Sequence, residues 1–352
     1  GRIRAHVVWF DSMGAKCSCI FVETPTTKIL VDPGVAAMQA GYPLPPEEKT
    51  RLEKMAYSRI MQFSKQAEVI TISHYHYDHH MLPQRAPRLY QGKMLLVKDP
   101  NQWINNSQWD RARLFFTQLV EYYGAGEEIT TAPRSIKFVD PLEELPLCAG
   151  KDFGDYNQRR AELFEKGRKW MERMYKKWSS GKWIRDGVEL KKLRVRFADG
   201  RSFKFGNTKL RFTSPMFHGI EYDRLGWVVG LVIEHGRSKL IHTSDLQGPM
   251  IEDYAQWVIE ENPDVLVIDG IPTYLYGFTI TTTSLRRGME NIMRIVKETD
   301  TKVIIYDHHL PRDRLYAQRV VEIYKIPEAK GRLLTAAEWL GEEPLILRIT
   351  RT

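Results

Sequence analysis

The segment TISHYHYDHH, residues 71–80, constrains what this chain can fold into more than any other part of the sequence. It places Asp78 and four of the chain's ten histidines within seven positions. A packed core gains little from so many imidazoles, because each buried polar group has to be desolvated and hydrogen-bonded. A divalent metal ion compensates for that cost. The segment directly follows the strand-like run EVITIS, so we expect a metal site in the loop at the carboxyl end of a strand.

The spacing within this segment suits two ions. His74 and His76 point the same way if the strand continues through them, because side chains two apart in a strand share a face. Asp78 and His79 lie beyond the turn that follows, so one ion can be held by the first pair and a neighbouring ion by the second. Imidazole and carboxylate ligands suit zinc. His80 is expected to be structural or to support a ligand.

Other ligand-type residues follow strand-like runs far along the chain. His218 follows KLRFTSPMF, Asp245 follows KLIHTS, and His308 follows KVIIYD. His309 competes with His308 for the last position, and we favour His308 because it directly follows the strand and its aspartate. Asp32 ends the run KILVD and is expected to accept a hydrogen bond from a ligand imidazole, which would fix the tautomer of that imidazole.

Short β-branched runs alternate with helical patterns along the chain, which predicts an α/β fold. Several runs, such as DVLVIDG and KVIIYD, are almost wholly apolar, as in a sheet covered on both faces. Apolar residues at helical spacing predict helices over residues 45–66 and 105–123. A third helix is expected to begin with Thr283 or Ser284 as its cap.

A change of composition near residue 124 predicts an insertion, about 124–200, within a single domain spanning residues 1–352. The insertion contains the amphipathic segment RRAELFEKGRKWMERMYKKW. Its predicted apolar face consists of Leu163, Trp170, Met171, Met174 and Trp178. From residue 156 to 196 the chain carries 14 Lys and Arg against five Asp and Glu, a local net charge of +9, so the rest of the chain sums to about −1 and the net charge of +8 lies in this segment.

This basic segment has an ordinary interpretation and a functional one. A charged helix face is most often a solvated face, with the apolar stripe packed on the domain or on another subunit in a homo-oligomer. In the functional interpretation, the segment binds an anionic substrate such as nucleic acid. Basic side chains would then neutralise phosphates, and four aromatic side chains would stack on bases. These are Trp170, Tyr175, Trp178 and Trp183.

The remaining bulk features favour a cytoplasmic protein without a membrane span. No run of 18 or more apolar residues is present, and the N-terminal residues have no leader pattern. The three cysteines, Cys17, Cys19 and Cys148, form a sparse and odd set, which argues against a disulfide framework. We expect them to be ordinary buried residues.

The order of Asp32, the HxHxDH motif, His218, Asp245 and His308 resembles the metallo-β-lactamase superfamily. The segments HYHYDHH, HTSDLQGP and YDHHLPRD are similar to a little-characterised, mostly archaeal branch of that superfamily. The resemblance implies a four-layer αββα sandwich with the metal site at one edge. It also implies two divalent metal ions, zinc first, with manganese or iron as alternatives.

The resemblance also implies a role for each residue. One ion would be held by His74, His76 and His218, the second by Asp78, His79 and His308, and Asp245 would bridge the two. A hydroxide between the ions would be the nucleophile, with its pKa brought toward neutral by the cations. Asp78, besides being a ligand, would help to orient this hydroxide. Asp78 and Asp32 are therefore the predicted catalytic residues.

Departures from the superfamily pattern narrow the range of expected activities. Its lactamases have cysteine at the position of Asp245, so we do not expect hydrolysis of antibiotics. Its flavodiiron branch has glutamate at the position of His76, so we do not expect di-iron redox chemistry. One RNA-processing branch of the superfamily carries a large extra domain between the aspartate and the final histidine. Only 62 residues separate Asp245 from His308 in this chain, which is too few for such a domain. We therefore expect a dinuclear metal-dependent hydrolase, with phosphodiesters, in nucleic acid or nucleotides, as the favoured substrates. The alternatives are a lactone, ester or thioester hydrolase and a non-catalytic binding module on the same fold.

Overall fold

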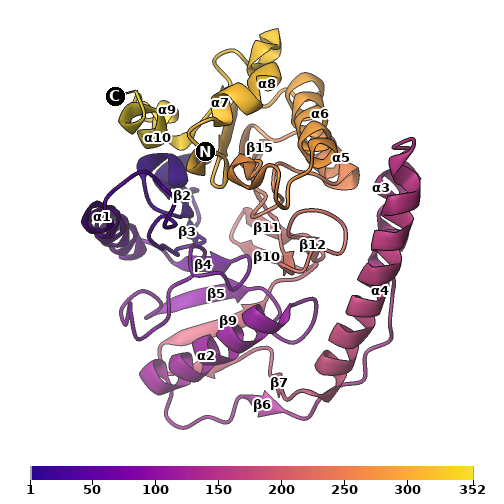
Figure 1. Cartoon of the computed structure of the whole chain (residues 1–352). Coiled ribbons are helices and arrows are strands. Elements are labelled where there is room, and N and C mark those ends of the chain that lie inside the picture. Colours follow the sequence, from indigo (N-terminus) through magenta and orange to yellow (C-terminus); the bar gives the residue numbers. More distant parts are fainter. Residues whose placement is uncertain (1, 352) are drawn as a thin grey trace.

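The computed structural model describes residues 2–351 and shows two mixed sheets packed face to face between layers of helices (Figure 1). This is the four-layer αββα sandwich expected from the sequence. The first sheet has seven strands in the order β1-β2-β3-β4-β5-β9-β8. Their bounds are β1 Arg4–Phe10, β2 Ser18–Glu23, β3 Lys28–Val31, β4 Val69–Ile72, β5 Lys93–Val97, β9 Leu193–Phe197 and β8 Glu189–Leu190.

The second sheet also has seven strands, in the order β10-β11-β14-β15-β16-β17-β18. Their bounds are β10 Ser202–Phe205, β11 Thr208–Phe212, β14 Leu231–His235, β15 Ser238–His242, β16 Val265–Asp269, β17 Val303–Asp307 and β18 Leu333–Leu334. Two short pairs complete the strands: β6 (Thr130–Thr131) with β7 (Trp183–Ile184), and β12 (Met216–Phe217) with β13 (Trp227–Val228).

Parallel pairing brings strand ends together at one edge of each sheet. In the first sheet β3, β4, β5 and β9 pair in parallel, and β1 runs in the same direction because β1 and β3 are both antiparallel to β2. In the second sheet β15, β16, β17 and β18 pair in parallel. Residues that directly follow these strands therefore gather at a common edge.

The longer helices cover the outer faces of the sheets (Figure 1). They are α1 (Pro46–Ser64) and α2 (Asn106–Tyr123) on the first sheet, and α5 (Glu252–Glu261) and α6 (Thr282–Glu298) on the second. The shorter helices are α7 (Tyr316–Arg319), α8 (Val321–Lys325), α9 (Ala336–Trp339) and α10 (Leu345–Ile349). Single 3-10 turns are η1 (Asp11–Met13), η2 (Pro141–Glu144), η3 (Thr273–Leu275), η4 (Leu310–Arg312) and η5 (Pro327–Ala329).

Three buried layers hold the sandwich together. Between the sheets, Val7, Ile20 and Val31 of the first sheet belong to the same buried cluster as Leu231 and Val267 of the second. The outer face of each sheet forms a separate cluster with its own helices. Such near-complete burial on both faces explains why the parallel strands are almost wholly apolar in sequence.

The predicted insertion contains α3 (Pro146–Gly150) and the 25-residue helix α4 (Tyr156–Ser180), which runs along one side of the molecule (Figure 1). Its predicted end near residue 200 is too late. Strands β8 and β9 lie within 124–200, yet they pair with β5 as part of the first sheet. The added segment therefore ends before Glu189.

Two local predictions also need correction. The cap of α6 is Thr281, whose hydroxyl accepts a hydrogen bond from the amide of Ser284, rather than Thr283 or Ser284. A run of hydroxyl residues offers several possible caps, and the apolar stripe does not decide among them. Leu163 was expected on the apolar face of α4, but it is 38% exposed, whereas the other four predicted residues of that face are buried.

Two other expectations agree with the structure. The three cysteines are buried and form no disulfide. Within residues 2–351, no helix has the length and apolar character needed to cross a bilayer.

Candidate metal centre

All seven predicted ligands meet at the edge of the sandwich where the parallel strands end. The loop after β4 supplies four of them, and the residues that follow β12, β15 and β17 supply the others. Positions far apart in sequence come into contact: Nε2 of His79 lies 3.2 Å from Nε2 of His308 and 3.1 Å from Oδ1 of Asp245. Nε2 of His218 lies 3.1 Å from Oδ2 of Asp245.

The ligand atoms form two main groups. In each group every ligand atom lies within 4.8 Å of the others, and the groups are His74, His76, His218 and Asp245, and Asp78, His79 and His308. We call these the first group and the second group. Asp245 contacts both, because its Oδ1 also lies 3.5 Å from Nε2 of His308. This division matches the two ligand sets that the superfamily resemblance implied.

His309 also lies beside the centre, in a third group with Asp245 and His308. However, Nδ1 of His309 is hydrogen-bonded to the Asp269 carboxylate at 2.8 Å. His308, in contrast, directs Nε2 toward His79 and Asp245. The Nδ1–carboxylate contact of His309 is also the arrangement of His79 and His308, so the choice of His308 over His309 stays a prediction.

Backbone strain marks the same place. Asp32, Ser244, Gln247 and His308 all have a positive φ, between 47° and 57°. Residues other than glycine adopt this left-handed conformation at a cost, and such strain concentrates at functional sites. The backbone also packs closely here: a Cβ on Gly34 would lie 2.2 Å from the amide nitrogen of His80, so only glycine fits at this position.

Each of the five imidazoles in the two groups also has a polar partner at its other ring nitrogen. The pairs are His74 Nδ1 with Ser73 Oγ (3.1 Å), His76 Nε2 with Gln108 Nε2 (3.4 Å), His79 Nδ1 with Asp32 Oδ2 (2.8 Å), His218 Nδ1 with Gln247 Nε2 (3.4 Å) and His308 Nδ1 with Asp11 Oδ1 (3.1 Å). Such partners orient imidazoles that hold metals and set their tautomers. The hydrogen bond expected of Asp32 is present.

Sequence reasoning missed Asp11, Gln108 and Gln247. Asp11 directly follows the strand-like run AHVVWF, so the rule that located Asp32 and Asp245 would also have located Asp11. Gln108 lies in α2, 33 positions beyond Tyr75, whose amide donates to Oε1 of Gln108 at 3.1 Å. Nothing in the local pattern of that helix distinguishes it from other polar residues.

Burial and mutual charge set the protonation of the centre. Burial lowers the pKa of His74 and of His76 well below the usual value, which leaves both imidazoles neutral, as metal ligands must be. Burial acts in the same direction on His79, but the carboxylates of Asp245 and Asp32 outweigh it and raise the pKa of His79 to about 10. Burial tends to raise the pKa of Asp245, yet His79, His308 and His74 hold it well below the usual range.

The buried polar atoms of the first group fit a cation. Both carboxylate oxygens of Asp245, and Nε2 of His218, are buried and make no regular hydrogen bond within residues 2–351. Imidazole nitrogens of His79 and His218 lie 3.1 Å from these oxygens, so the buried carboxylate faces other donors of the same centre, an environment that suits a divalent cation. The donor set, five imidazoles and two carboxylates, suits zinc and related divalent ions.

The centre opens to solvent on the side of His76 and Asp78. His74, His79, His218, Asp245 and His308 are all buried, whereas His76 is partly exposed and the Asp78 side chain is 15% exposed. A cavity of about 310 Å³ is connected to the centre through Gln247, which contacts His218, and through Leu225. None of the seven predicted ligands is among its lining residues in the described part of the chain, which are Ile220, Asp223, Arg224, Leu225, Gln247, Leu275, Thr279 and Ile280. The Leu225 carbonyl accepts a hydrogen bond from Gln108 Nε2, the atom that also contacts His76.

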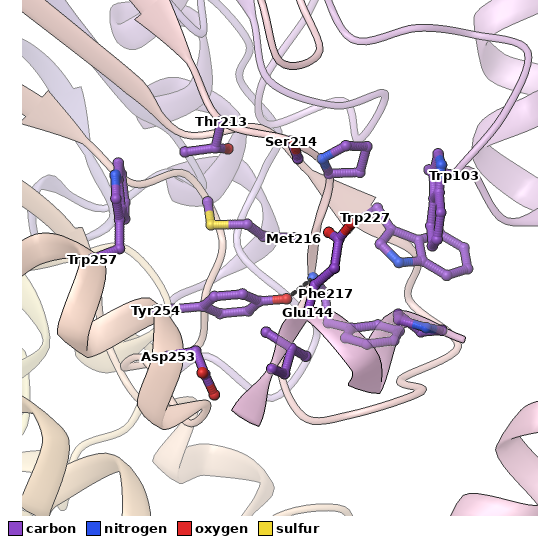
Figure 2. A pocket seen from close by; sticks show the side chains of 13 residues that line it. Trp103, Glu144, Thr213, Ser214, Met216, Phe217, Trp227, Asp253, Tyr254 and Trp257 are labelled. Atoms are coloured by element: carbon purple, nitrogen blue, oxygen red, sulfur yellow. Dashed lines mark hydrogen bonds between the residues drawn. The ribbon is translucent and has the colours of Figure 1, made fainter. Parts of the chain in front are cut away.

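A second cavity, of about 330 Å³, lies behind the strand that leads to His218 (Figure 2). Aromatic side chains line much of it, including Trp103, Trp227 and Trp257. None of the seven predicted ligands is among its lining residues in the part of the chain described here. On its wall, the Tyr254 hydroxyl accepts a hydrogen bond from the amide of Phe217 at 2.8 Å. This bond holds the backbone next to His218.

The aromatic residues of the basic segment are buried, so the predicted stacking of bases on them is wrong. Trp178 is fully buried, and its Nε1 donates to the carbonyl of Ile104 at 2.9 Å. Trp170 stacks on Trp227 with ring centroids 5.4 Å apart. Tyr175 and Trp183 are less than 9% exposed. Helical spacing shows which residues share a face but not whether that face packs on the same domain.

Comparison with known proteins places the chain among archaeal relatives. It is 33% identical over 362 residues to a UPF0282 protein of Methanopyrus kandleri, covering 99% of this chain and 98% of the relative. It is 32% identical over 337 residues to a UPF0282 protein of Korarchaeum cryptofilum, covering 95% and 88%. No family model matches the chain.

Solved structures have a lower sequence identity to this chain. An isothiocyanate hydrolase from Delia radicum gut bacteria aligns with a TM-score of 0.45 and 14% identity, covering 92% of this chain and 95% of the neighbour. A metallo-β-lactamase fold protein of Bacillus subtilis aligns with a TM-score of 0.41 and 11% identity, covering 95% of each chain. The activities that these names state are those of the neighbouring proteins and are not assigned to this chain.

Proposed function

The chain belongs to the UPF0282 family, and from its metal centre we propose that it is a hydrolase dependent on two divalent metal ions. The observation that carries this proposal is the convergence of seven ligand-type side chains whose five imidazoles are each oriented by a polar partner. Structural packing has no need for such an arrangement, whereas metal binding requires both the donors and their orientation.

In this proposal the first group holds one ion and the second group holds the other, with Asp245 shared. When bound, two such cations acidify a water molecule and polarise the oxygens of the group under attack. Asp78 is the carboxylate nearest the opening, so it is placed to accept a hydrogen bond from the attacking water and to hold its proton. Asp32 keeps the His79 imidazole in a single orientation through Nδ1.

Phosphodiesters of nucleotide size are the substrates that we favour. The cavity of about 310 Å³ is at the small end of ligand pockets, which suits a cyclic mononucleotide or a dinucleotide better than a long polymer. Arg224, an exposed residue on its wall, offers a guanidinium that matches phosphate geometry. Pairs of divalent ions are common in phosphatases and nucleases.

A second candidate is a small lactone, ester or thioester. Four apolar side chains favour it, because they make half of the lining of the same cavity: Ile220, Leu225, Leu275 and Ile280. A substrate with an apolar body would bury that body against them. The non-catalytic binding module has less support, because the complete donor set lies at an opening to solvent.

Metal analysis and a substrate panel test the proposal together. We expect the native protein to retain divalent metal and to hydrolyse bis-p-nitrophenyl phosphate or a dinucleotide faster than a lactone or an acyl thioester. His76→Ala and Asp245→Asn should each lower metal retention and lower activity by more than about 100-fold, beyond the loss typical of an outer partner. His6→Ala, a change in a strand remote from the centre, is the control. A native protein that neither retains metal nor takes up added zinc or manganese would refute the proposal.

A further inference from the structure

The Arg312 guanidinium occupies the second group of ligands. Arg312 ends η4, four positions after His308, and its side chain is only 7% exposed. Its Nη2 lies 3.3 Å from Oδ2 of Asp78 and 3.3 Å from Nε2 of His308. Both atoms are the ones through which the second group would hold an ion.

A buried ion pair fixes the guanidinium in that place. Nε of Arg312 donates to the Asp11 carboxylate, and the other oxygen of Asp11 faces Nδ1 of His308 at 3.1 Å. Arg312 and His308 are thus held by the same carboxylate. An arginine keeps its proton at every pH relevant to proteins, so its nitrogens can only donate hydrogen bonds and cannot serve as ligands.

The first group has no guanidinium among its contacts. Its donors contact one another and the uncharged side chains of Ser73, Ser244, Gln108 and Gln247. Asp245 also contacts the imidazoles of His79 and His308, which are themselves donors of the second group. Both oxygens of Asp245 and Nε2 of His218 are left without a regular hydrogen bond within residues 2–351. The two groups therefore differ: a cation completes the first, whereas in the second it has to displace the guanidinium.

From this difference we propose that the two metal sites are unequal. The first group binds its ion tightly, and the second group binds more weakly because Arg312 competes for Asp78 and His308. This inference rests on the proposed metal centre, but it concerns the order and affinity of binding and not the reaction. Arg312 is a positioning residue in this account, since it acts on the ligands.

A titration of the metal-free native protein with zinc tests the proposal, read out as ions bound per chain after equilibrium dialysis. We expect two steps that differ by about tenfold or more in affinity, because hydrogen bonds to charged groups are worth roughly that factor. His218→Ala should remove the tighter step, and His308→Ala the weaker one. Arg312→Gln should tighten the weaker step by about tenfold and leave the tighter step unchanged.

Arg319→Gln is the matched control, because Arg319 pairs with Asp313 and, within residues 2–351, makes no hydrogen bond or ion pair with either group. Two native steps of equal affinity would overturn the proposal while leaving the proposed hydrolase intact. Two unequal steps that Arg312→Gln does not alter would also overturn it. If Arg312→Gln fails to fold, Arg312→Lys, which keeps the charge but loses the planar fork, replaces it and should tighten the weaker step less. A protein that binds no ion at all would refute the proposed function itself.

Discussion

At the scale of single residues, the centre depends on carboxylates that need not touch a metal. Asp32 and Asp11 each hold the remote nitrogen of one imidazole, His79 and His308 respectively. These carboxylates also make the imidazoles more basic despite burial: together with Asp245, Asp32 raises the pKa of His79 to about 10, and Asp11 raises the pKa of His308. Orientation and protonation are therefore set by the same contacts.

This coupling predicts that metal binding releases protons and becomes tighter with rising pH. Without an ion, His79 is protonated below a pH of about 10, because the carboxylates of Asp245 and Asp32 outweigh burial and raise its pKa to about that value. A cation needs the neutral imidazole, so each ion bound by the second group expels that proton. Calorimetric titrations with zinc at pH 7.5 in buffers of different ionisation enthalpy should show net proton release. Affinity that did not change between pH 6.5 and 9 would contradict this prediction.

At the scale of elements, helix α4 shows that a charged amphipathic helix can be part of a domain's core. Its buried face packs against Trp103 and Trp227, next to the strand that leads to His218. Its exposed basic residues partly pair with acidic neighbours, as Lys169 does with Glu165 at 2.6 Å. The helix thus supports, by packing, the edge of the sandwich where the candidate metal centre lies. This role does not depend on the function of its charged face.

Packing of α4 predicts unequal effects for two substitutions on the same helix. Trp178→Ala should lower the free energy of unfolding by about 3–5 kcal/mol, because Trp178 is fully buried and its removal leaves a large cavity. Leu163→Ala should change it by less than about 0.5 kcal/mol, because that side chain is 38% exposed. Chemical denaturation of the metal-free proteins measures both. Similar effects for the two variants would mean that α4 does not pack as described.

At the scale of the whole molecule, the two sheets act together. Asp32 and the histidine loop end strands of the first sheet, whereas Asp245 and His308 end strands of the second. The centre therefore exists only when both sheets are packed against each other. The basic segment, in contrast, lies on an added helix at one side of this sandwich (Figure 1).

A substrate of nucleotide size predicts a weak response to salt. Hydrolysis of a dinucleotide should change by less than about tenfold between 50 and 200 mM salt, because few phosphates are contacted. A polymer held along the basic segment, with six to ten phosphate contacts, would instead lose about 10³-fold or more in affinity. Steady-state kinetics at both salt concentrations distinguishes the small substrate from the polymer. The measurement is repeated with a triple variant that combines Lys166→Gln, Arg173→Gln and Lys176→Gln. A steep salt dependence that the triple variant abolishes would favour a nucleic-acid polymer.

The sequence by itself determined the parts of this protein that follow from local rules. Strand-like runs followed by ligand-type residues predicted an α/β fold and the seven candidate ligands, and the resemblance to the metallo-β-lactamase superfamily added the two-sheet sandwich and the two ligand sets. Pattern reasoning works there because a strand end places the next side chain at a known edge, and parallel strands share that edge.

Only the tertiary structure decided which side chains surround those seven. The partners Gln108 and Gln247, the burial of Trp170 and Trp178, and the position of Arg312 between Asp78 and His308 all depend on contacts between distant segments. A helical stripe looks the same in sequence whether it faces solvent, a partner or its own domain. An arginine four positions beyond a ligand carries no local sign of the direction in which its side chain turns.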